Sequence, residues 1–513
     1  MRLLILGLDG LSWNMLDRFD VDATFISRIR NHGVDGDLHS VDPPATFPAW
    51  TSFATGKDPS SHGVTNMIEQ GSDYNITPCR PNREDAAIFD FLPNSTFVNL
   101  QGSYGREPAS QNSHLVSGKL APERSDAVPG PLRELDTYNS YHVFKDDKFI
   151  GSAKQEHPEE YVAHLSEIIT SRYEFASEAF NETDPDVGFV LFAAIDWLSH
   201  FLSNAKSEEQ ARDWYSRLIE LTDSYCEELA QNAENVVIVS DHGFEHKRRY
   251  IHLNHWLEET GYLVEKTADE SSLSRKAVDF GLMLTRRSGS LNRVLRSGYD
   301  LISGTSYGQN IVEAAKLTVD YPESLAWDIR DGCIYINDND FEKPQISETD
   351  EVRDQIISEI EAINSDSERP IFRDVVTSAD AYAAPDENTP DIIARPAPNY
   401  VITEARGPSG EMISKCDKFD HRYRGVFAAD GQLFEEKRTI EGLYLEDVLP
   451  TLLHALNQPV APDFDGTVSK DVLRTNETPS VLSMDDVPRP RLSGTENADD
   501  AVEERLADLG YIE

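Results

Sequence analysis

Short apolar runs alternate with longer amphipathic stretches over roughly the first half of the chain. Residues 159–179 and 208–230 carry apolar side chains three and four positions apart, which is typical of amphipathic helices. The apolar runs are typical of strands buried on both faces of a parallel sheet; they lie at 3–8, 96–100, 187–193 and 236–240. Because strands alternate with helices, the pattern predicts an α/β fold with a doubly wound, mostly parallel sheet sandwiched by helices.

Changes in composition along the chain predict its domain organisation. We expect residues 1–265 to form the first part of a core α/β catalytic domain, with a loop-rich excursion at 79–155. Residues 266–400 are helix-like, with basic patches, and predict a cap-like insertion. The chain then returns to the core at 401–474. Residues 475–513 predict an acidic linker, rich in Pro, Ser, Asn and Asp, followed by a terminal helix.

The charge of the chain changes which partners are expected. Its 513 residues include 91 Asp and Glu against 47 Lys and Arg, a net charge of −44. Such a surface repels nucleic acids and anionic membranes, so no nucleic acid duplex is expected as a partner. It suits a protein that stays dissolved in high salt, which indicates a halophilic, haloarchaeal source. The 39% hydrophobic residues are enough for a folded core.

The cysteines and the N-terminus indicate a cytoplasmic location. Four scattered cysteines form no C-x-x-C pair and are expected to be reduced thiols. The apolar run in MRLLILGLDG is too short for a secretory leader and is better explained as a buried first strand. No window of about 18 apolar residues predicts a membrane span. No pattern in the sequence predicts an oligomeric state.

The stretch PPATFPAWTSFATG, residues 43–56, places a threonine at a helix start. Pro48 fits a first helical turn, and Gly56 is typical of a helix end. Thr46 therefore lies at or just before a helix N-terminus, where free N–H groups favour negative charge. It could be a simple N-cap residue. It could also be a nucleophile whose phosphoryl substrate is held by that helix end.

Asp and His residues follow several of the predicted strands. Asp9 follows the first strand, and Asp241 and His242 follow VVIVS. In DWLSH, Asp196 and His200 are four residues apart, so a helix would place them on one face. His421, in HRYRGVF, is a further candidate. Mixed Asp and His ligands suit zinc or a similar transition metal ion. Each pair alone could equally be a helix cap, a turn or a surface pair.

In this order, the elements identify a family resemblance. The chain resembles the alkaline phosphatase superfamily, and within it the type I phosphodiesterase/nucleotide pyrophosphatase-like and predicted phosphohydrolase/phosphomutase proteins. The resemblance is carried by LGLDG, PPATFPAWTSFATGKDPSSHGV, DWLSH, SDHGFEHKRRYIHLNHWLEETGYL and HRYRGVF. It implies an alkaline phosphatase-like fold and a hydrolase that acts on small phosphorylated substrates.

The resemblance also implies roles for individual residues. Thr46 would be the nucleophile and would form a covalent phospho-threonine intermediate. Two divalent metal ions would be bound, with Zn²⁺ expected and Mn²⁺ or Mg²⁺ as alternatives. The first would be held by Asp9, Asp241, His242 and Thr46, and the second by Asp196, His200 and His421. Asn66 and Arg248 are candidate substrate contacts.

Other activities stay open at this point. A phosphomutase or a phosphoryl or phosphonate hydrolase of the same superfamily would use a related site. A sulfatase is disfavoured, since no Arg follows Thr46 in residues 47–55. A non-catalytic metal-binding protein could keep the same fold.

Overall fold

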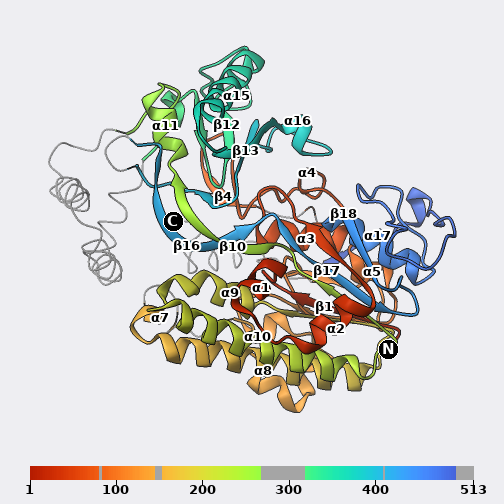
Figure 1. The fold of residues 1–513 in the computed structure, drawn as a ribbon. Coiled ribbons are helices and arrows are strands. Elements are labelled where there is room, and N and C mark those ends of the chain that lie inside the picture. Colours follow the sequence, from red (N-terminus) through yellow and green to blue (C-terminus); the bar gives the residue numbers. More distant parts are fainter. Residues whose placement is uncertain are drawn as a thin grey trace.

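A computed structural model describes residues 1–79, 82, 84–144, 149, 153–266, 318–407 and 411–492. Its centre is an eight-stranded sheet in the order β18-β2-β17-β9-β1-β8-β5-β7 (Figure 1). Neighbouring strands are parallel except where β17 lies antiparallel between β2 and β9. The strands are β1 (Leu3–Leu8), β2 (Val34–His39), β5 (Ser95–Leu100), β7 (His114–Ser117), β8 (Val187–Phe192), β9 (Asn235–Val239), β17 (Arg424–Gly431) and β18 (Arg438–Tyr444). The predicted fold class is confirmed.

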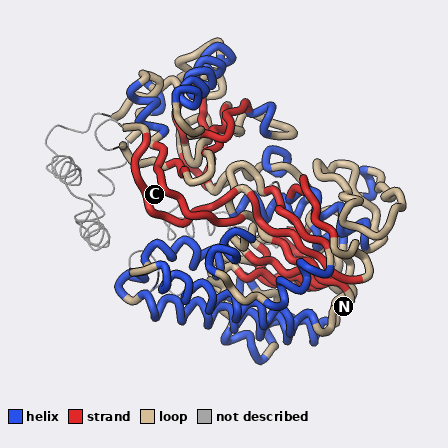
Figure 2. Tube along the Cα trace, in the orientation of Figure 1, coloured by secondary structure: helices blue, strands red, loops and turns tan. Residues whose placement is uncertain are grey.

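Helices cover both faces of this sheet, as Figure 2 shows. One face packs against α1 (Trp13–Phe19), α2 (Thr24–His32), α8 (Pro158–Thr183), α9 (Ala194–Phe201) and α10 (Glu208–Ala230). The other packs against α3 (Thr46–Thr55), α5 (Ile88–Phe91) and α17 (Leu445–Ala455). The four predicted strands and the two predicted helices all form within a few residues of their expected bounds.

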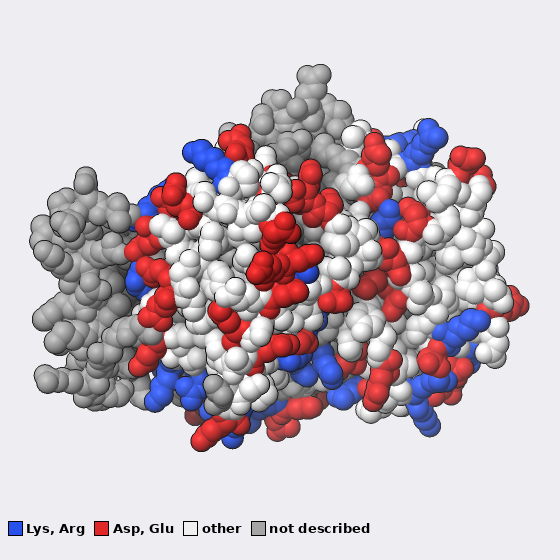
Figure 3. Space-filling view, turned by 90° about the horizontal axis from the view of Figure 1, so that it is seen from above, with Lys and Arg blue, Asp and Glu red and all other residues white. Residues whose placement is uncertain are grey.

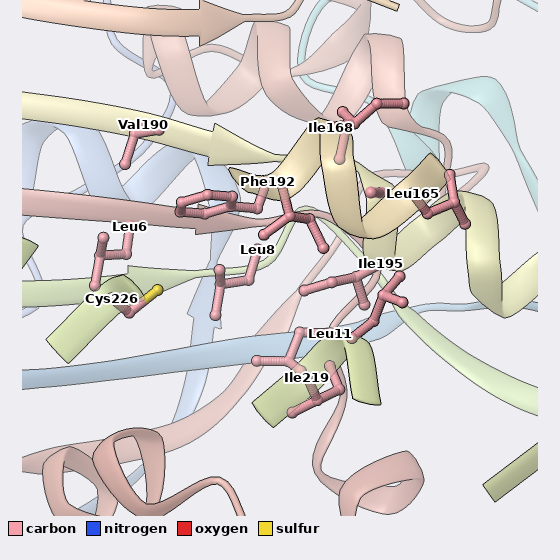
Figure 4. Close-up of a cluster of buried hydrophobic side chains, with 14 of the residues drawn as sticks. Leu6, Leu8, Leu11, Leu165, Ile168, Val190, Phe192, Ile195, Ile219 and Cys226 are labelled. Carbon is pink, nitrogen blue, oxygen red and sulfur yellow. The ribbon is translucent and has the colours of Figure 1, made fainter. Parts of the chain in front are cut away.

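Side chains of β1 alternate between two hydrophobic clusters. Leu4, Leu6 and Leu8 belong to the cluster under α8 and α10, shown in Figure 4, and Leu3 and Ile5 to the cluster under α3 and α17. All five are fully buried. Successive side chains of a strand point to opposite faces, so a continuous apolar run is what a strand with helices on both faces requires.

A second α/β unit lies beyond the sheet, and we refer to its residues 318–402 as the cap. Its four-stranded sheet has the order β11-β12-β14-β13 and packs against α15 (Thr349–Asp366) and α11 (Leu253–Glu259). The strands are β11 (Ala326–Asp328), β12 (Cys333–Ile336), β13 (Phe372–Thr377) and β14 (Ile392–Pro396); α16 (Ser378–Ala381) follows β13. Residues 267–317 of the predicted insertion lie outside the described residues.

Two long strands join the cap to the central sheet. β10 (Gly243–Ile251) pairs antiparallel with β16 (Ile413–Arg422) and parallel with β15 (Tyr400–Ile402). The hydrophobic cluster of the cap also includes Ile68, in the hairpin of β3 (Ile68–Gln70) and β4 (Ile76–Pro78), and Ile251. Chain segments that precede the cap in sequence thus contribute to its core.

The predicted loop-rich excursion at 79–155 needs a correction. It contributes β5 and β7 to the central sheet, so part of it is core. The elements described between and after them are short: β6 (Arg106–Glu107), α6 (Arg124–Ala127), two 3-10 turns (Gly130–Glu134 and Asp136–Ser140) and α7 (Ala153–Glu156). The stretch 475–492 is mostly exposed and ends in β19 (Arg491–Leu492), which pairs with β6. The predicted terminal helix lies outside the described residues.

Candidate metal centre and nucleophile

Thr46 is the first residue of α3. Ala45 is the N-cap residue, and no side chain caps this end of the helix. The Thr46 hydroxyl instead lies 3.4 Å from His242 Nε2. Gly56 ends the helix in the left-handed region, with φ 66°, as expected for a C-terminal glycine. The reading of Thr46 as a side-chain N-cap is therefore not what the structure shows.

The first predicted ligand group comes together at the carboxyl ends of two adjacent strands. β1 and β9 pair in parallel, so Asp9 and Asp241 leave the sheet side by side. His242 Nε2 lies 3.2 Å from Asp241 Oδ2 and 3.8 Å from Asp9 Oδ1. The outer oxygens are anchored: the Gly10 N–H donates to Asp241 Oδ1 (3.1 Å), and Trp50 Nε1 donates to Asp9 Oδ2 (3.3 Å).

The second predicted group forms one strand further along the sheet. Asp196 and His200 lie on α9, which follows β8 directly, so the helix expected for DWLSH is confirmed. Asp196 Oδ1 lies 3.4 Å from both His200 Nε2 and His421 Nε2. The two imidazole nitrogens are 3.0 Å apart. His421 arrives from β16, more than 200 residues later.

The histidine rings are oriented by oxygen acceptors. The Nδ1 of His421 is 2.7 Å from the Pro44 carbonyl oxygen, and that of His242 is 3.3 Å from the Gly243 carbonyl oxygen. A carbonyl only accepts, so each Nδ1 carries the proton and each Nε2 presents a lone pair. This is the arrangement by which proteins orient histidines that bind metals.

Burial and mutual repulsion perturb the carboxylates. Burial raises the pKa of Asp9 well above its ordinary value, and the Asp241 carboxylate adds to the rise. Burial, with Asp196, raises the pKa of Asp241 to about 7. At Asp196 burial acts in the same direction, but His200 and His421 outweigh it and the pKa is lowered. Acidic groups are thus crowded together where water does not screen them.

The donor set fits divalent cations. Asp9 Oδ1, Asp196 Oδ1 and Asp241 Oδ2 are buried and have no hydrogen-bond partner among the described residues. These same oxygens face the histidine Nε2 atoms. Carboxylate oxygens and imidazole nitrogens that converge in this way suit Zn²⁺ or a similar ion. Within the part of the chain that the structure describes, three sets of side chains have the required proximity: Asp9, Asp241 and His242; Asp196, His242 and His421; and His200, Asp420 and His421.

A cavity of about 480 Å³ opens over this centre. Thr46, Asp196, His200 and His421 line it, and so does the predicted contact Asn66. The other predicted contact, Arg248, is exposed, and among the described residues its neighbour Lys247 lines the cavity instead.

Sequence reasoning missed several polar residues of this cavity. They are Lys119, Lys154, Lys247, Arg330, Asp331, Lys418 and Asp420. The sequence offers a signal for two of them, since Lys247 lies within five residues of the DHG motif and Lys418 within five residues of the DHR motif.

The remaining histidines of these motifs have structural partners. His62 is fully buried; its Nδ1 accepts from the Val64 N–H, and its Nε2 donates to Ser52 Oγ (2.9 Å). His252 lies between the Ala405 carbonyl and Ser414 Oγ. Neither lines the cavity over the candidate centre.

Comparisons with known proteins identify the family. The sequence profile of the type I phosphodiesterase/nucleotide pyrophosphatase family matches residues 3–424. The chain belongs to this family. The family is part of the alkaline phosphatase superfamily, and its members are metal-dependent hydrolases of phosphoric esters that act on small phosphorylated substrates.

Similar solved structures include two of the ectonucleotide pyrophosphatase/phosphodiesterase 5 proteins. The murine protein, as an inactive variant in complex with AMP, is 14% identical with a TM-score of 0.48 and covers 92% of this chain and 100% of its own. The human protein is also 14% identical, with a TM-score of 0.47, and covers 93% and 100%. No curated protein matches the chain. No helix among the described residues is long and apolar enough to cross a membrane.

Proposed function

We propose that this member of the phosphodiesterase family hydrolyses phosphoric esters with Thr46 as the nucleophile and two divalent cations. The observation that carries the proposal is the position of the Thr46 hydroxyl, which lies 3.4 Å from His242 Nε2 in a cavity that Asp196, His200 and His421 also line. A simple helix cap would point this hydroxyl back at its own helix.

The ligand assignment follows the two groups of side chains. Asp9, Asp241 and His242 would hold one cation beside Thr46, and Asp196, His200 and His421 the other. When bound, such cations supply charge neutralisation and lower the pKa of a coordinated hydroxyl. The mixed carboxylate and imidazole donors favour Zn²⁺, with Mn²⁺ or Mg²⁺ as alternatives.

Side-chain and backbone groups of the protein carry out the transfer of the phosphoryl group. Thr46 Oγ loses its proton to solvent and attacks phosphorus, so that a Thr46 O–P bond forms while the ester O–P bond breaks. The leaving alkoxide takes a proton from solvent and departs as the alcohol. The N–H groups of Thr46 and Phe47, at the start of α3, have no partner within the helix and would donate to a bound phosphoryl group. Water then attacks phosphorus and releases Thr46, which regains a proton. Asn66, which lines the cavity, would donate to a phosphoryl oxygen.

We also propose a cytoplasmic location and a halophilic source for the protein. All four cysteines are free thiols, which suits the predicted cytoplasmic location. The net charge of −44 suits the predicted halophilic source.

A substrate screen tests the activity. The purified protein, assayed in molar KCl with Zn²⁺ or Mn²⁺, should hydrolyse aryl phosphate monoesters, diesters or both. It should also retain two metal ions per chain by elemental analysis. Bound metal without turnover of any ester would favour the non-catalytic alternative.

A further inference from the structure

The cavity over the candidate centre reverses the charge balance of the chain. Asp and Glu outnumber Lys and Arg about two to one overall. Among the residues that the structure describes, the cavity lining holds five basic residues and three acidic ones; the basic ones are Lys119, Lys154, Lys247, Arg330 and Lys418. Lysine is scarce, with 15 in the whole sequence, and four of these line the cavity. Positive charge is therefore concentrated where a substrate would bind.

Two of these lysines form a pair across the strands that carry the cap. β10 and β16 are antiparallel, and their register places Lys247 directly opposite Lys418 and Glu245 opposite Asp420. Directly opposed residues lie on the same face, about 5 Å apart at Cβ, and like charges there repel. Each ammonium group also contacts a carboxylate on its own strand: Lys247 to Glu245 at 2.7 Å and Lys418 to Asp420 at 2.6 Å.

The lysine pair lies beside the candidate centre and not inside it. Asp420 Oδ1 is 3.8 Å from His200 Nδ1, and its other oxygen contacts Lys418. One carboxylate thus separates Lys418 from the second ligand group. The Lys418 side chain is 39% exposed, while that of Lys247 is 7% exposed. Lys247 is therefore fixed in the cavity wall, while Lys418 has room to move toward a ligand.

We propose that Lys247 and Lys418 form a second anion site, which binds a negatively charged group of the substrate other than the phosphoryl group that reacts. The inference rests on the proposed function, since it assigns the reacting phosphoryl group to Thr46. Lysine suits this task as a compact charge with several donors, so one hydrogen bond to Glu245 or Asp420 leaves others for a ligand. The second group would be a phosphoryl or a carboxylate.

A purely structural role for the pair predicts a different result. Ion pairs that only hold two strands together affect stability, and they do not discriminate between ligands. A second anion site, by contrast, raises affinity for ligands that carry two anionic groups over those that carry one. The affinity ratio of matched ligands separates the two roles.

Isothermal titration of the metal-loaded protein in about 1 M KCl provides this ratio without turnover. Methylphosphonate offers one anionic group, phosphonoacetate adds a carboxylate, and methylenediphosphonate adds a phosphonate. We expect the wild type to bind at least one of the two-group ligands about tenfold or more tightly than methylphosphonate. The preferred ligand identifies the second group.

Variants locate the site. Lys418→Gln should lower that ratio about fivefold or more, and Lys418→Arg, which keeps the charge, should preserve most of it. Lys415→Gln is the matched control, because Lys415 lies exposed on the same strand and does not line the cavity. Lys247→Gln should act like Lys418→Gln if its melting temperature shows that it folds.

The experiments distinguish a failure of the second anion site from a failure of the proposed hydrolase activity. A wild type without preference for two-group ligands overturns the second anion site, as does an unchanged ratio in Lys418→Gln. A protein that shows the preference and its loss, but hydrolyses no ester, keeps the anion site and loses the proposed hydrolase activity.

Discussion

At the scale of single residues, Thr46 is the position where the proposed chemistry can be tested most directly. Thr46→Ala should lower kcat by several orders of magnitude, since no oxygen remains to attack phosphorus. Thr46→Ser should retain part of the rate. Because no side-chain cap is lost, the melting temperature of both variants should stay close to that of the wild type. Steady-state kinetics and thermal melting of the three proteins provide the comparison.

The stereochemical course of the same reaction gives an independent check. Two in-line displacements, first by Thr46 and then by water, should give net retention of configuration at phosphorus. Direct attack by water would give inversion. Inversion with a chiral phosphorothioate diester, or an active Thr46→Ala protein, would exclude the covalent route.

Substitution of a proposed metal ligand should reduce both the bound metal and the turnover. His200→Ala or Asp241→Asn removes one donor from its group, so we expect a loss of bound metal and of turnover in each. Elemental analysis after dialysis measures the metal content. His252→Ala is a suitable comparison, because His252 has structural partners away from the cavity. Full activity in either ligand variant would show that the assignment is wrong.

His62 should make stability depend on pH. Burial lowers the pKa of His62 to about 3, with a small contribution from Lys57. An unfolded histidine has a pKa of about 6.5, so the unfolded chain binds more protons below that pH. The stabilising effect is complete above about pH 6.5 and falls by up to about 1.4 kcal/mol per pH unit as the pH falls toward 3. Urea unfolding between pH 7 and 5 should therefore be less pH-dependent in His62→Gln, and equal slopes would contradict this.

The sequence is sufficient to predict the candidate site residues that directly follow a predicted strand. Asp9 and Asp241 directly follow apolar runs, and Asp196 and His200 are four residues apart. It could not find Lys418 as a cavity residue, because its place there depends on the register between β10 and β16. That register pairs segments about 170 residues apart, and no local pattern encodes it.

At the scale of elements, the cap holds the segment that leads to Thr46. Asp42, four residues before Thr46, accepts from Arg395 Nη2 of β14 at 2.8 Å. The Tyr382 hydroxyl donates to the Asp42 carbonyl at 2.8 Å, and His421 donates to the Pro44 carbonyl. Side chains from the cap and from β16 thus fix the turn from which the nucleophile projects.

Breaking this contact should be costly. The Asp42 and Arg395 side chains are only 10% and 17% exposed, so Arg395→Gln leaves a mostly buried carboxylate with one distant partner, Arg373. We expect the free energy of unfolding to fall by about 2–4 kcal/mol. Arg353→Gln, which breaks the exposed pair with Asp350 on α15, should cost about 0–1 kcal/mol. Urea midpoints in molar KCl measure both, and equal shifts would contradict the role of Arg395.

Three strands of the central sheet that escaped prediction have mixed side chains. β2 has the sequence VDGDLH, β18 has RTIEGLY, and β17 has RGVFAADG. β2 and β18 lie toward one edge of the sheet, where polar residues can reach solvent. Within the sheet, Asp35 of β2 accepts hydrogen bonds from Arg30 and Thr439. Tertiary partners therefore outweigh the missing apolar pattern.

At the scale of the whole molecule, the acidic surface should make stability depend on salt. Figure 3 shows Asp and Glu side chains spread over the displayed face, with fewer Lys and Arg among them. Repulsion within a net charge of −44 weakens as the Debye length falls to about 3 Å in 1 M salt. We expect the melting temperature to rise steeply between about 0.1 and 2 M KCl. A flat curve by differential scanning fluorimetry would exclude salt adaptation and leave the site unaffected.

The single antiparallel strand of the central sheet has a consequence for biosynthesis. β17 separates β2 from β9, so these strands cannot complete the sheet until the ribosome has delivered residues 424–431. The cap strands, at 326–396, leave the exit tunnel earlier. The nascent chain therefore reaches an intermediate in which the cap can fold while the core still exposes an open sheet edge. Such edges attract other chains, which makes this intermediate the expected client of chaperones that act during translation.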